Sequence, residues 1–479
     1  MSAPEFAAGW ELVVGLEAHV ELSTATKLFC GCANRFGDEP NRNVCPTCLG
    51  LPGSLPVVNQ TAVDYAMRLG RALGCSVEPS VFARKNYFYP DMPKDYQISQ
   101  YDQPTNVDGV LVLADGSEIR IERAHIEEDT GKSIHMGGAG RIHDADYSLV
   151  DYNRAGVPLV EIVSRPEIGS VDQARMYVSE LRSILIATGV SDARMEEGSL
   201  RVDANVSVRP VGSDALRTRC EIKNINSIRS LGRSIEYEAR RHIDLYDAGE
   251  RPRQETRHWD EEGGRTTPGR SKEDADDYRY FQEPDLVPLV PTAEVIASID
   301  SSMPALPAER RSRLTEVSAA ETESISVIVE RGQDDLALAA IAAGADPAKV
   351  VTRLENDLAV DDWSHVDADG IARLVQMETG GELTATQAKQ VLADMVESGD
   401  GPESIAARRG FEAMADSDLE VLVDQLIAAN PEEWDRFRSG DDGDRKKMAG
   451  FLTGQIMKST KGQADGRAVA ELLERKAAG

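Results

Sequence analysis

The stretch "VVGLEAHVEL", residues 13–22, indicates the fold of the N-terminal half of the chain. Apolar residues alternate here with Glu17, His19 and Glu21, which is the pattern of a β-strand whose two faces differ in polarity. One face belongs in a hydrophobic core. The other is either a solvated face or a metal and substrate site, and the spacing alone does not distinguish the two.

The same alternation recurs in "LRVDANVSV" (200–208) and "CEIKNIN" (220–226), and "PLVEIVS" (158–164) places one carboxylate among apolar neighbours. The polar residues on these expected strands are Glu161, Arg201, Asp203, Asn205, Ser207, Glu221 and Lys223. Each strand taken singly is more often half-buried than functional. Together they predict a sheet face that holds Mg²⁺ through oxygen ligands and leaves room for nucleotide phosphates. Such a face favours metal-assisted phosphoryl transfer, with Arg or Lys offsetting the phosphate charge.

The segment "EEDTGKSIH" (127–135) resembles the end of a phosphate-binding P-loop, but the residue five positions before Gly131 is Ile126 and not glycine. The P-loop interpretation is therefore excluded. What remains is an imidazole beside three carboxylates, which is either a solvated acidic loop or part of the same site. These residues are His125, Glu127, Glu128 and Asp129.

Four cysteines in "CGCANRFGDEPNRNVCPTC" form two closely spaced pairs, Cys30 with Cys32 and Cys45 with Cys48. Two such pairs joined by a loop predict a tetrahedral zinc site, and four thiolates leave no open position for catalysis. The zinc is therefore expected to be structural. The alternative is four reduced thiols without metal.

Composition limits the class of protein. The 479 residues carry 53 basic and 82 acidic side chains, a net charge of -29, which opposes indiscriminate binding of nucleic acid. No apolar run approaches the length of a membrane helix, and the first residues do not resemble a secretory signal. We expect a cytoplasmic protein with no membrane association, in which any RNA contact is local.

The order of strand, turn and helix patterns along the chain predicts an α+β architecture. Up to about residue 290, short strand patterns alternate with turns such as "ADGS" (114–117), and two helices are expected at 60–74 and 171–188. This favours a domain built on an antiparallel sheet over residues 1–295. After the proline-rich 283–294 segment only helical patterns follow, with a linker near residue 400. Two all-α domains are therefore expected, at 296–402 and 403–479.

Two further segments are distinctive. "RKNYFYPDMPKDYQISQYDQP" (84–104) is rich in aromatic residues, and it either packs on itself or stacks an adenosine or a tRNA end. Residues 445–476 hold eight Lys or Arg against three acids. This basic tail is either a solvated face or an RNA contact, for which the candidates are Lys446, Lys447, Lys458 and Lys461.

Long motifs along nearly the whole chain carry a resemblance to a known family. They include "VGLEAHVEL", "HIEEDTGKS", "DYNRAGVPLVEIVS", "RMEEGSLRVDANVSVRP", "EIKNINS", "DDYRYFQEPDLVPL" and "GFLTGQIMKSTKGQA". Together they resemble the B subunits of the aspartyl/glutamyl-tRNA(Asn/Gln) amidotransferases, the GatB/GatE family. The motifs are dense over the first 290 residues, sparse from about 300 to 400, and return in the tail.

The resemblance implies a cradle-shaped kinase domain related to glutamine synthetase, a helical linker domain and a YqeY-like tail that binds tRNA. It implies ATP and Mg²⁺, which phosphorylate the side-chain carboxylate of Glu or Asp mischarged on tRNA(Gln) or tRNA(Asn). Ammonia then displaces the phosphate. Because no nucleophile constellation for glutamine hydrolysis is visible here, the ammonia is expected from the amidase-type glutaminase of the GatCAB complex. The small C subunit of that complex would complete a heterotrimer.

Site residues follow from the same resemblance. The metal ligands carry over most directly onto His19 and Glu127, with Glu17, Glu161 and Glu221 as further Mg²⁺ ligands and Asp203 and Asn205 as catalytic companions. Nucleotide contacts are expected from Arg201, Lys223 and Glu128. Two other interpretations remain open: a non-catalytic, zinc-stapled tRNA-binding protein, and a stand-alone metallohydrolase that uses His19 and the carboxylates without ATP.

Overall fold

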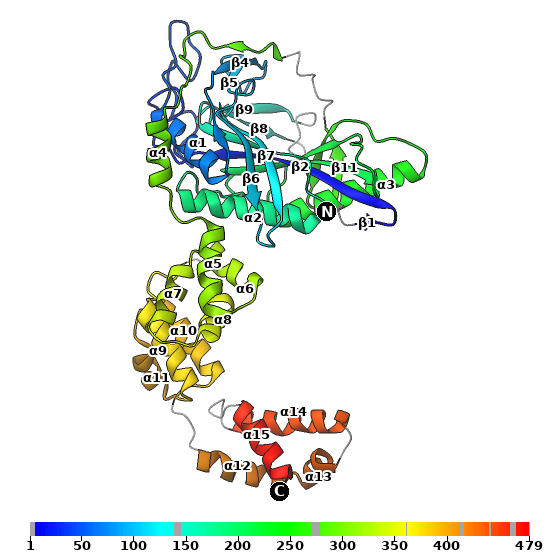
Figure 1. Cartoon of the computed structure of the whole chain (residues 1–479), viewed down its shortest axis with the longest axis vertical. Coiled ribbons are helices and arrows are strands. Elements are labelled where there is room, and N and C mark those ends of the chain that lie inside the picture. The colour runs from blue at the N-terminus through cyan, green and yellow to red at the C-terminus, as the bar shows by residue number, and fades with distance from the viewer. Residues whose placement is uncertain are drawn as a thin grey trace. The chain divides into compact units, whose positions relative to one another are not determined.

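A computed structural model describes residues 5–137, 145–269, 278–360, 362–411, 416–439, 442–459 and 466–478. The chain divides into two compact units, 1–308 and 309–479, which we describe separately. The first unit is built on a large sheet and the second is helical (Figure 1). The predicted α+β class is therefore confirmed.

The main sheet of the first unit runs in the order β14-β13-β12-β11-β2-β10-β7-β5-β4-β15, and β8 pairs with β9 in a separate ribbon. Strand pairing is antiparallel, as predicted, except between β12 and β13. Helix α3 connects those two strands, and a crossover of this kind is what parallel neighbours require. The strands are β1 Glu5–Ala7, β2 Trp10–Glu21, β3 Ser76–Val77, β4 Ala83–Asn86, β5 Tyr96–Ser99, β6 Asn106–Val112, β7 Glu118–Glu128, β8 Lys132–Met136, β9 Tyr147–Asp151, β10 Pro158–Ser164, β11 Leu200–Pro210, β12 Cys220–Lys223, β13 Thr256–Asp260, β14 Arg265–Pro268 and β15 Phe281–Gln282.

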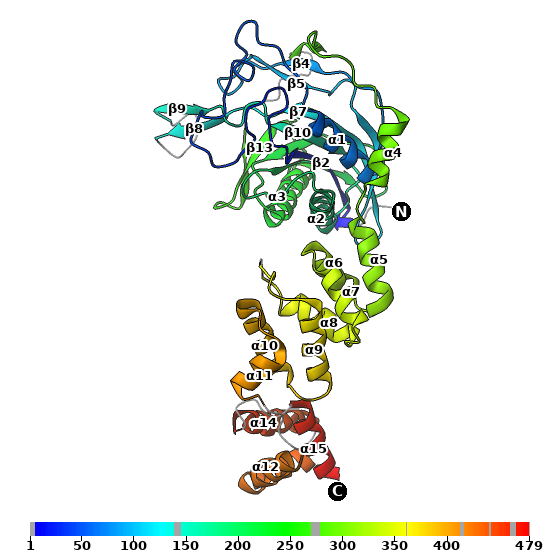
Figure 2. The ribbon, with the colours of Figure 1, turned by 90° about the vertical axis from the view of Figure 1, so that its left-hand side faces the viewer.

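Helices α1 (Gln60–Ala72), α2 (Val171–Thr188) and α3 (Ile228–Asp247) lie on one side of this sheet (Figure 2). They confirm both predicted helices, and Gly189 ends α2 in the left-handed conformation. The alternate residues of β2 that face this side, from Val14 to Val20, are fully buried in the first core. On the opposite side β2 carries Glu17, His19 and Glu21.

Glu238 ties α3 to the edge of the sheet. Its buried carboxylate accepts hydrogen bonds from Thr266 (2.7 Å) and Arg241, and His242 Nε2 lies 3.2 Å away. Burial would raise the pKa of Glu238, but the interactions with His242 and Arg241 outweigh it and hold this pKa well below its usual range. The ionised carboxylate therefore stabilises the first unit.

We expect Glu238→Gln to lower the free energy of unfolding by about 3 kcal/mol at pH 7, because Arg241 and Arg257, which both pair with this buried carboxylate, lose their counter-charge. The depressed folded-state pKa means that this stabilisation is present above the unfolded pKa of about 4.3 and fades as the pH falls below it. Urea unfolding at pH 7 and pH 3 measures both effects. The control is Glu236→Gln on the same helix, which loses an exposed pair with Arg240. Equal effects of the two substitutions would contradict the assignment.

The first unit extends further than the sequence predicts. Helix α4 (Ala293–Ser301) contributes Ile299 to the first core, and Arg71 of α1 binds Asp300 at 2.8 Å. The predicted boundary between residues 295 and 296 therefore falls inside α4.

The second unit shows only helices in its described residues, and it contains two separate hydrophobic cores. The middle core runs from Leu314 to Ala406, and the tail core from Leu419 to Leu473. The helices are α5 Pro307–Ser318, α6 Thr322–Glu330, α7 Asp334–Ala342, α8 Pro347–Asn356, α9 Ala368–Thr379, α10 Ala385–Ser398, α11 Pro402–Arg409, α12 Asp416–Ala429, α13 Pro431–Ser439, α14 Asp442–Ser459 and α15 Gly466–Ala478.

Residues 399–401, the expected linker near residue 400, form a short turn. Gly399 ends α10 in the left-handed conformation, and α11 then packs Ile405 and Ala406 into the middle core. The predicted division at residue 402 therefore passes through the start of a helix that belongs to the middle core. The tail core begins only in α12.

Candidate functional site

The polar strand faces predicted from the sequence lie side by side, because β12, β11, β2, β10 and β7 are consecutive in the main sheet. Strand register places His19 opposite both Glu161 and Arg201. The same register pairs Glu17 with Asp203, and it pairs Asn205 with Glu221. We call this polar side of the sheet, away from α1–α3, the carboxylate face.

The first group on the carboxylate face consists of His19, Glu127 and Glu161. His19 Nε2 lies 3.8 Å from Glu127 Oε1 and 3.6 Å from Glu161 Oε2. One ligand atom from each of the three lies within 4.8 Å of the others. An imidazole and two carboxylates at this spacing form a donor set that fits a divalent cation.

Electrostatics within this group favour a bound cation. Burial, and then the neighbouring Glu161, raise the pKa of Glu127 to about 7. Burial would lower the pKa of His19, but the interaction with Glu161 and the charges of the other nearby carboxylates raise it to about 9. His125, His19 and Arg123 outweigh burial and hold the pKa of Glu161 well below its usual range. The raised pKa values of Glu127 and His19 both reflect a negative local potential, which is typical of a functional site that attracts a cation.

His125, the imidazole that the sequence places beside three carboxylates, is a neighbour of this group. The side chain is fully buried, its Nε2 lies 3.8 Å from Glu161, and neither ring nitrogen has a hydrogen-bond partner among the described residues. Burial lowers its pKa to about 4, so the ring is neutral. Arg123 also approaches Glu161, at 3.8 Å. The solvated-loop alternative for this segment is therefore wrong at His125.

The second group on the carboxylate face lies across β2, β11 and β12. Asn205 Nδ2 donates to Glu17 Oε1 (2.8 Å), and Lys223 Nζ lies 2.6 Å from Asp203 and 3.6 Å from Glu221. Glu221 also accepts a hydrogen bond from Thr256 Oγ1 (2.7 Å). The predicted companions of His19 are thus brought to the same side of the sheet, with one lysine among them.

A third group consists of Asp129 and two arginines that contact its carboxylate, Arg201 and Arg154. The sequence analysis did not single out Arg154. Arg201 Nη2 binds Asp129 Oδ2 at 2.7 Å, and Arg154 Nε approaches the same oxygen at 3.4 Å. Burial and the Asp129 carboxylate raise the pKa of Glu21 to about 7. The alternation in residues 13–22 already placed Glu21 beside Glu17 and His19, whereas the contact of Arg154 with Asp129 is long-range and carried no local signal.

Glu128 is not part of the carboxylate face. Adjacent residues of a strand point to opposite sides of the sheet, so Glu128 turns away from Glu127. Its carboxylate pairs with Lys94 and accepts a hydrogen bond from the Ile98 N–H (2.9 Å) in the interior. The predicted nucleotide contact of Glu128 is therefore not supported, and period-two alternation was the signal that argued against it.

One part of the aromatic stretch 84–104 packs on itself, and another part leaves a ring exposed beside the carboxylate face. Tyr87 and Tyr89 stack on each other, with ring centroids 4.7 Å apart, as a self-packed loop would. Tyr101, in contrast, is 41% exposed and stacks on Tyr280 (5.2 Å), with its ring edge-on to His125. Tyr280 lies just before β15, which pairs with β4. It falls within the motif "DDYRYFQEPDLVPL", but no periodic pattern there predicts its contact with Tyr101.

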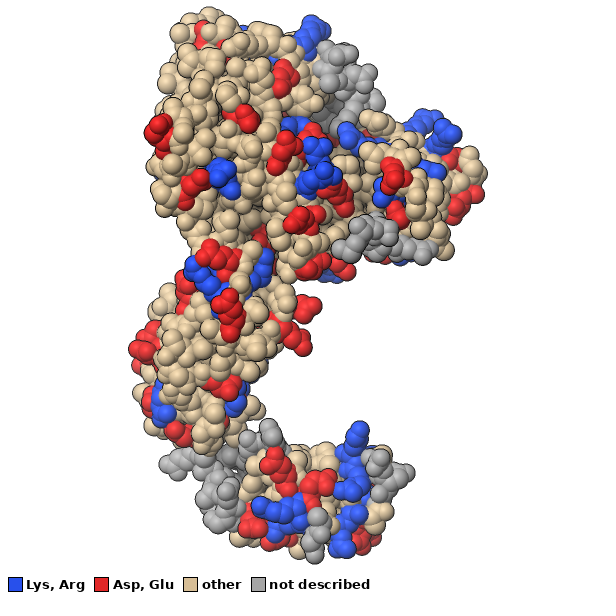
Figure 3. Space-filling view, in the orientation of Figure 1, with Lys and Arg blue, Asp and Glu red and all other residues tan. Residues whose placement is uncertain are grey.

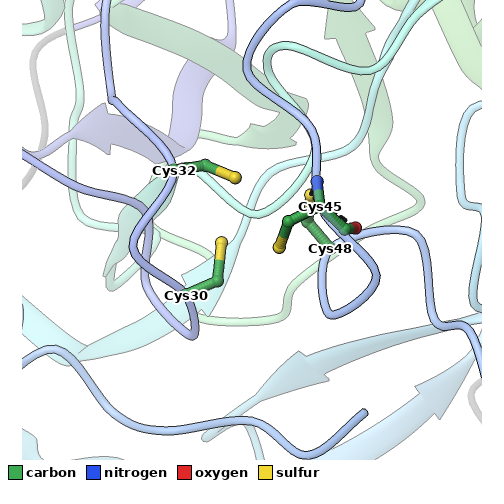
Figure 4. A group of neighbouring side chains, drawn as sticks. All are labelled: Cys30, Cys32, Cys45 and Cys48. Carbon is green, nitrogen blue, oxygen red and sulfur yellow. Dashed lines mark hydrogen bonds between the residues drawn. The ribbon is translucent and has the colours of Figure 1, made fainter.

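The four cysteines of the predicted zinc site converge, as Figure 4 shows. Their sulfur atoms lie within 4.8 Å of one another, close to the ~3.8 Å expected between thiolates on one tetrahedral zinc ion. The Cys45 N–H donates to Cys48 Sγ (3.1 Å). The neighbouring Cys30 thiol, and then the Cys45 N–H and the charge of Lys27, outweigh burial and lower the pKa of Cys48 to about 5. This cluster fits a metal ion.

Three of the four lysines predicted to contact RNA lie on α14. Lys446, Lys447 and Lys458 are exposed and form no ion pair with the described residues, whereas Lys476 of α15 binds Asp424 at 2.7 Å. Lys461 lies outside the described residues. Figure 3 shows Lys and Arg side chains on the visible face of the tail helices, interspersed with Asp and Glu. Among the described helices, none is both long and apolar enough to span a membrane.

The fold and the site define a class: a mixed α+β sheet protein with a carboxylate–imidazole cluster on one sheet face, a cysteine cluster and a helical C-terminal half. Residues 12–297 match the family described as the GatB/GatE catalytic domain, and residues 342–476 match the family described as the GatB domain. The chain therefore belongs to the GatB family.

Relatives that share one name span nearly its full length, and each is the B subunit of an aspartyl/glutamyl-tRNA(Asn/Gln) amidotransferase. The protein of Nocardia farcinica is 48% identical, over 99% of this chain and 97% of that protein. The protein of Nocardioides sp. is 47% identical, over 98% of both chains. That of Frankia casuarinae is 49% identical, over 97% of this chain and 95% of that protein. The family resemblance predicted from the motifs is thus confirmed.

Proposed function

We propose that this chain is the ATP-dependent subunit of a cytoplasmic tRNA-dependent amidotransferase, and therefore part of a ligase that forms a carbon–nitrogen bond. Its substrates are Glu-tRNA(Gln), Asp-tRNA(Asn) or both. The observation that supports this most strongly is the carboxylate face, where His19, Glu127 and Glu161 form a donor set suited to a divalent cation. The names of the relatives supply the tRNA substrate.

The chemistry follows from the poor reactivity of a carboxylate. Ammonia does not displace oxide from it, so one carboxylate oxygen first attacks the γ-phosphorus of ATP, and ADP leaves. Ammonia then adds to the carbonyl carbon of the acyl phosphate, the C–O bond to phosphate breaks, and the amide and inorganic phosphate remain. The proton that the nitrogen loses ends on the released phosphate. The ammonia itself is formed by hydrolysis of glutamine to glutamate in a partner protein.

The residues divide this work between them. His19, Glu127 and Glu161 would hold Mg²⁺, with Glu17 and Glu221 as further ligands on the second group. Bound Mg²⁺ supplies charge neutralisation on the phosphates during transfer. Arg201 and Lys223, which lie on the carboxylate face with partly exposed side chains, are suited to bind phosphate oxygens. Asp203 and Asn205 orient Lys223 and Glu17 through their hydrogen bonds.

The carboxylate face does not offer the groups that glutamine hydrolysis needs, so we infer that partner proteins supply the ammonia. This face offers carboxylates, imidazoles and cations, which suit phosphoryl transfer rather than glutamine hydrolysis. The ammonia therefore comes from an amidase-type glutaminase, and a small third protein, the C subunit, completes the heterotrimer. The cysteine cluster, which offers four thiols to one ion, holds a structural Zn²⁺ apart from this chemistry.

We assign the tail to tRNA and expect Lys446→Ala, Lys447→Ala and Lys458→Ala, combined, to weaken tRNA binding at least about 10-fold. The slope of affinity against salt should fall by about one for each lost phosphate contact. The KM for ATP should not change. Filter binding across a salt series measures this, and Lys476→Ala is the matched control because Asp424 already neutralises that lysine. Equal losses in the triple variant and the control would contradict the assignment.

The proposed function is tested by ADP formation in the reconstituted complex. We expect ADP to appear only with Mg²⁺ and mischarged tRNA, and to be lost in His19→Ala. A non-catalytic tRNA-binding protein would bind tRNA without forming ADP in any variant. A stand-alone metallohydrolase would act without ATP or partner proteins. Either result would overturn the proposal.

A further inference from the structure

The loop between the two cysteine pairs is hydrogen-bonded to residues 150–153, a distant segment of the chain. Asn41 receives a hydrogen bond from the Tyr152 N–H (2.8 Å) and donates from Nδ2 to the Val150 carbonyl (3.0 Å). Asn153 accepts from the Asn43 N–H (2.8 Å) and donates to the Glu39 carbonyl (2.8 Å). The contacts join residues more than 100 positions apart, so they fix how the cysteine loop meets residues 150–153.

Residues 150–153 are followed by a residue that contacts the carboxylate face. Arg154 follows Asn153, and its guanidinium donates to the carbonyls of Thr130 and Gly131, both at 3.0 Å. The same group lies 3.4 Å from the Asp129 carboxylate. Beyond it, the Asp129 N–H donates to the Val157 carbonyl (2.8 Å), which extends the pairing of β7 and β10 past their ends.

Asp129 is the point at which this segment meets the site. It is 3% exposed, and Arg201 binds its carboxylate at 2.7 Å from β11. It also lies two residues after Glu127, and its hydrogen bond to Val157 continues the pairing of β7, so the two carboxylates lie on the same side of the sheet. Arg154 therefore helps to position the Asp129 carboxylate, and this carboxylate in turn positions the guanidinium of Arg201.

We propose that the twelve residues between Cys32 and Cys45 act as a positioning element for the carboxylate face, through Asn41 and Asn153 to Arg154 and Asp129. The cysteine cluster brings the two ends of this loop together. Lys27, which is fully buried beside the cluster, donates to the Tyr152 carbonyl (3.1 Å). The orientation of Arg201 toward nucleotide thus depends on the cysteine loop. The inference rests on the proposed function for the identity of the nucleotide.

The test uses Asn41→Gly and Asn153→Ala in the full-length chain within its complex. Asn41 has a left-handed backbone (φ 60°), so glycine removes the side-chain hydrogen bonds without adding strain. We expect the KM for ATP and the calorimetric Kd for ATP each to rise about 10-fold, as losses of outer-shell partners do, with kcat changed less than twofold. The control is Arg42→Ala, which lies between Asn41 and Asn43 and pairs only with the exposed Glu39 among the described residues.

A double-substitution cycle with Arg154→Ala tests the route. If Asn153 acts through Arg154, Asn153→Ala should add almost nothing to the rise in Kd that Arg154→Ala produces alone. Additive effects would overturn the proposal, and so would a fall in kcat at constant KM and Kd with loss of zinc, which is the result of a merely structural loop. Failure of the proposed function is distinct: the wild-type complex would then bind ATP without forming ADP.

Discussion

Replacing Glu127 with glutamine is expected to reduce Mg²⁺-dependent ADP formation by at least about 100-fold. The substitution keeps the size of the side chain but removes one of two carboxylates that face His19 within 4 Å. Since the loss of even an outer-shell partner of a metal costs 10- to 100-fold, the loss of a direct ligand should lie at or beyond the upper end. The measurement is initial-rate ADP formation with saturating mischarged tRNA.

The same substitution should not weaken the fold. Burial and Glu161 raise the pKa of Glu127 to about 7, so its ionised form destabilises the metal-free protein above the unfolded pKa of about 4.3. In EDTA at pH 8, Glu127→Gln is therefore expected to be more stable than the wild type, by at least about 1 kcal/mol. At pH 4 the two should unfold alike. This opposition of stability and activity is typical of functional sites.

Glu118→Gln is the matched control, because Glu118 is exposed at the other end of β7. It should leave both ADP formation and stability unchanged. If Glu127→Gln kept more than a tenth of the wild-type rate, or lowered stability at pH 8, the assignment of Glu127 as a metal ligand would be wrong.

Removing one thiolate of the cysteine cluster is expected to have the second large effect. Cys48→Ser should abolish the binding of one zinc ion per chain and lower the melting temperature of the first unit by about 5 °C or more, because structural zinc contributes directly to folding. Zinc analysis by mass spectrometry and scanning calorimetry measure the two changes. The loop held by this cluster offers little apolar core of its own, and Leu51, Leu55 and Val57 near it are exposed.

Cys75→Ser separates the metal from the loss of a buried thiol. Cys75 is buried like Cys48, but it lies in the first core, away from the cluster. This variant should lose some packing energy and keep its zinc. A wild-type chain purified with four titratable thiols and no zinc, in buffers that contain the metal, would show that the cluster is not a metal site.

Period-two alternation predicted correctly which polar residues share one side of the sheet. The residues of 13–22 and 200–208 determine which side of a strand each faces, so Glu17, His19, Asp203 and Asn205 were placed on one face before any pairing was known. The hairpin at 114–117 was equally local, since its turn residues are adjacent. The same rule, applied strictly, would have removed Glu128.

What the sequence did not predict depends on contacts between distant residues. The pairing of Arg154 with Asp129, and the stacking of Tyr280 on Tyr101, join segments 25 or more positions apart and leave no periodic pattern. The domain boundaries differ from the predicted ones for a related reason. The glycines near residue 400 form a turn within the middle core, and only the packing of Ile405 shows which core α11 belongs to.

The central claim is that the side-chain carboxylate of the mischarged amino acid is phosphorylated on the carboxylate face, and oxygen transfer tests it most directly. Mischarged tRNA is prepared with oxygen-18 in that carboxylate and given to the reconstituted complex with Mg²⁺, ATP and glutamine. We predict one labelled oxygen in inorganic phosphate for each amide formed, and neither product with Glu127→Gln. Amide formation accompanied by unlabelled phosphate, or unaffected by Glu127→Gln, would contradict the claim.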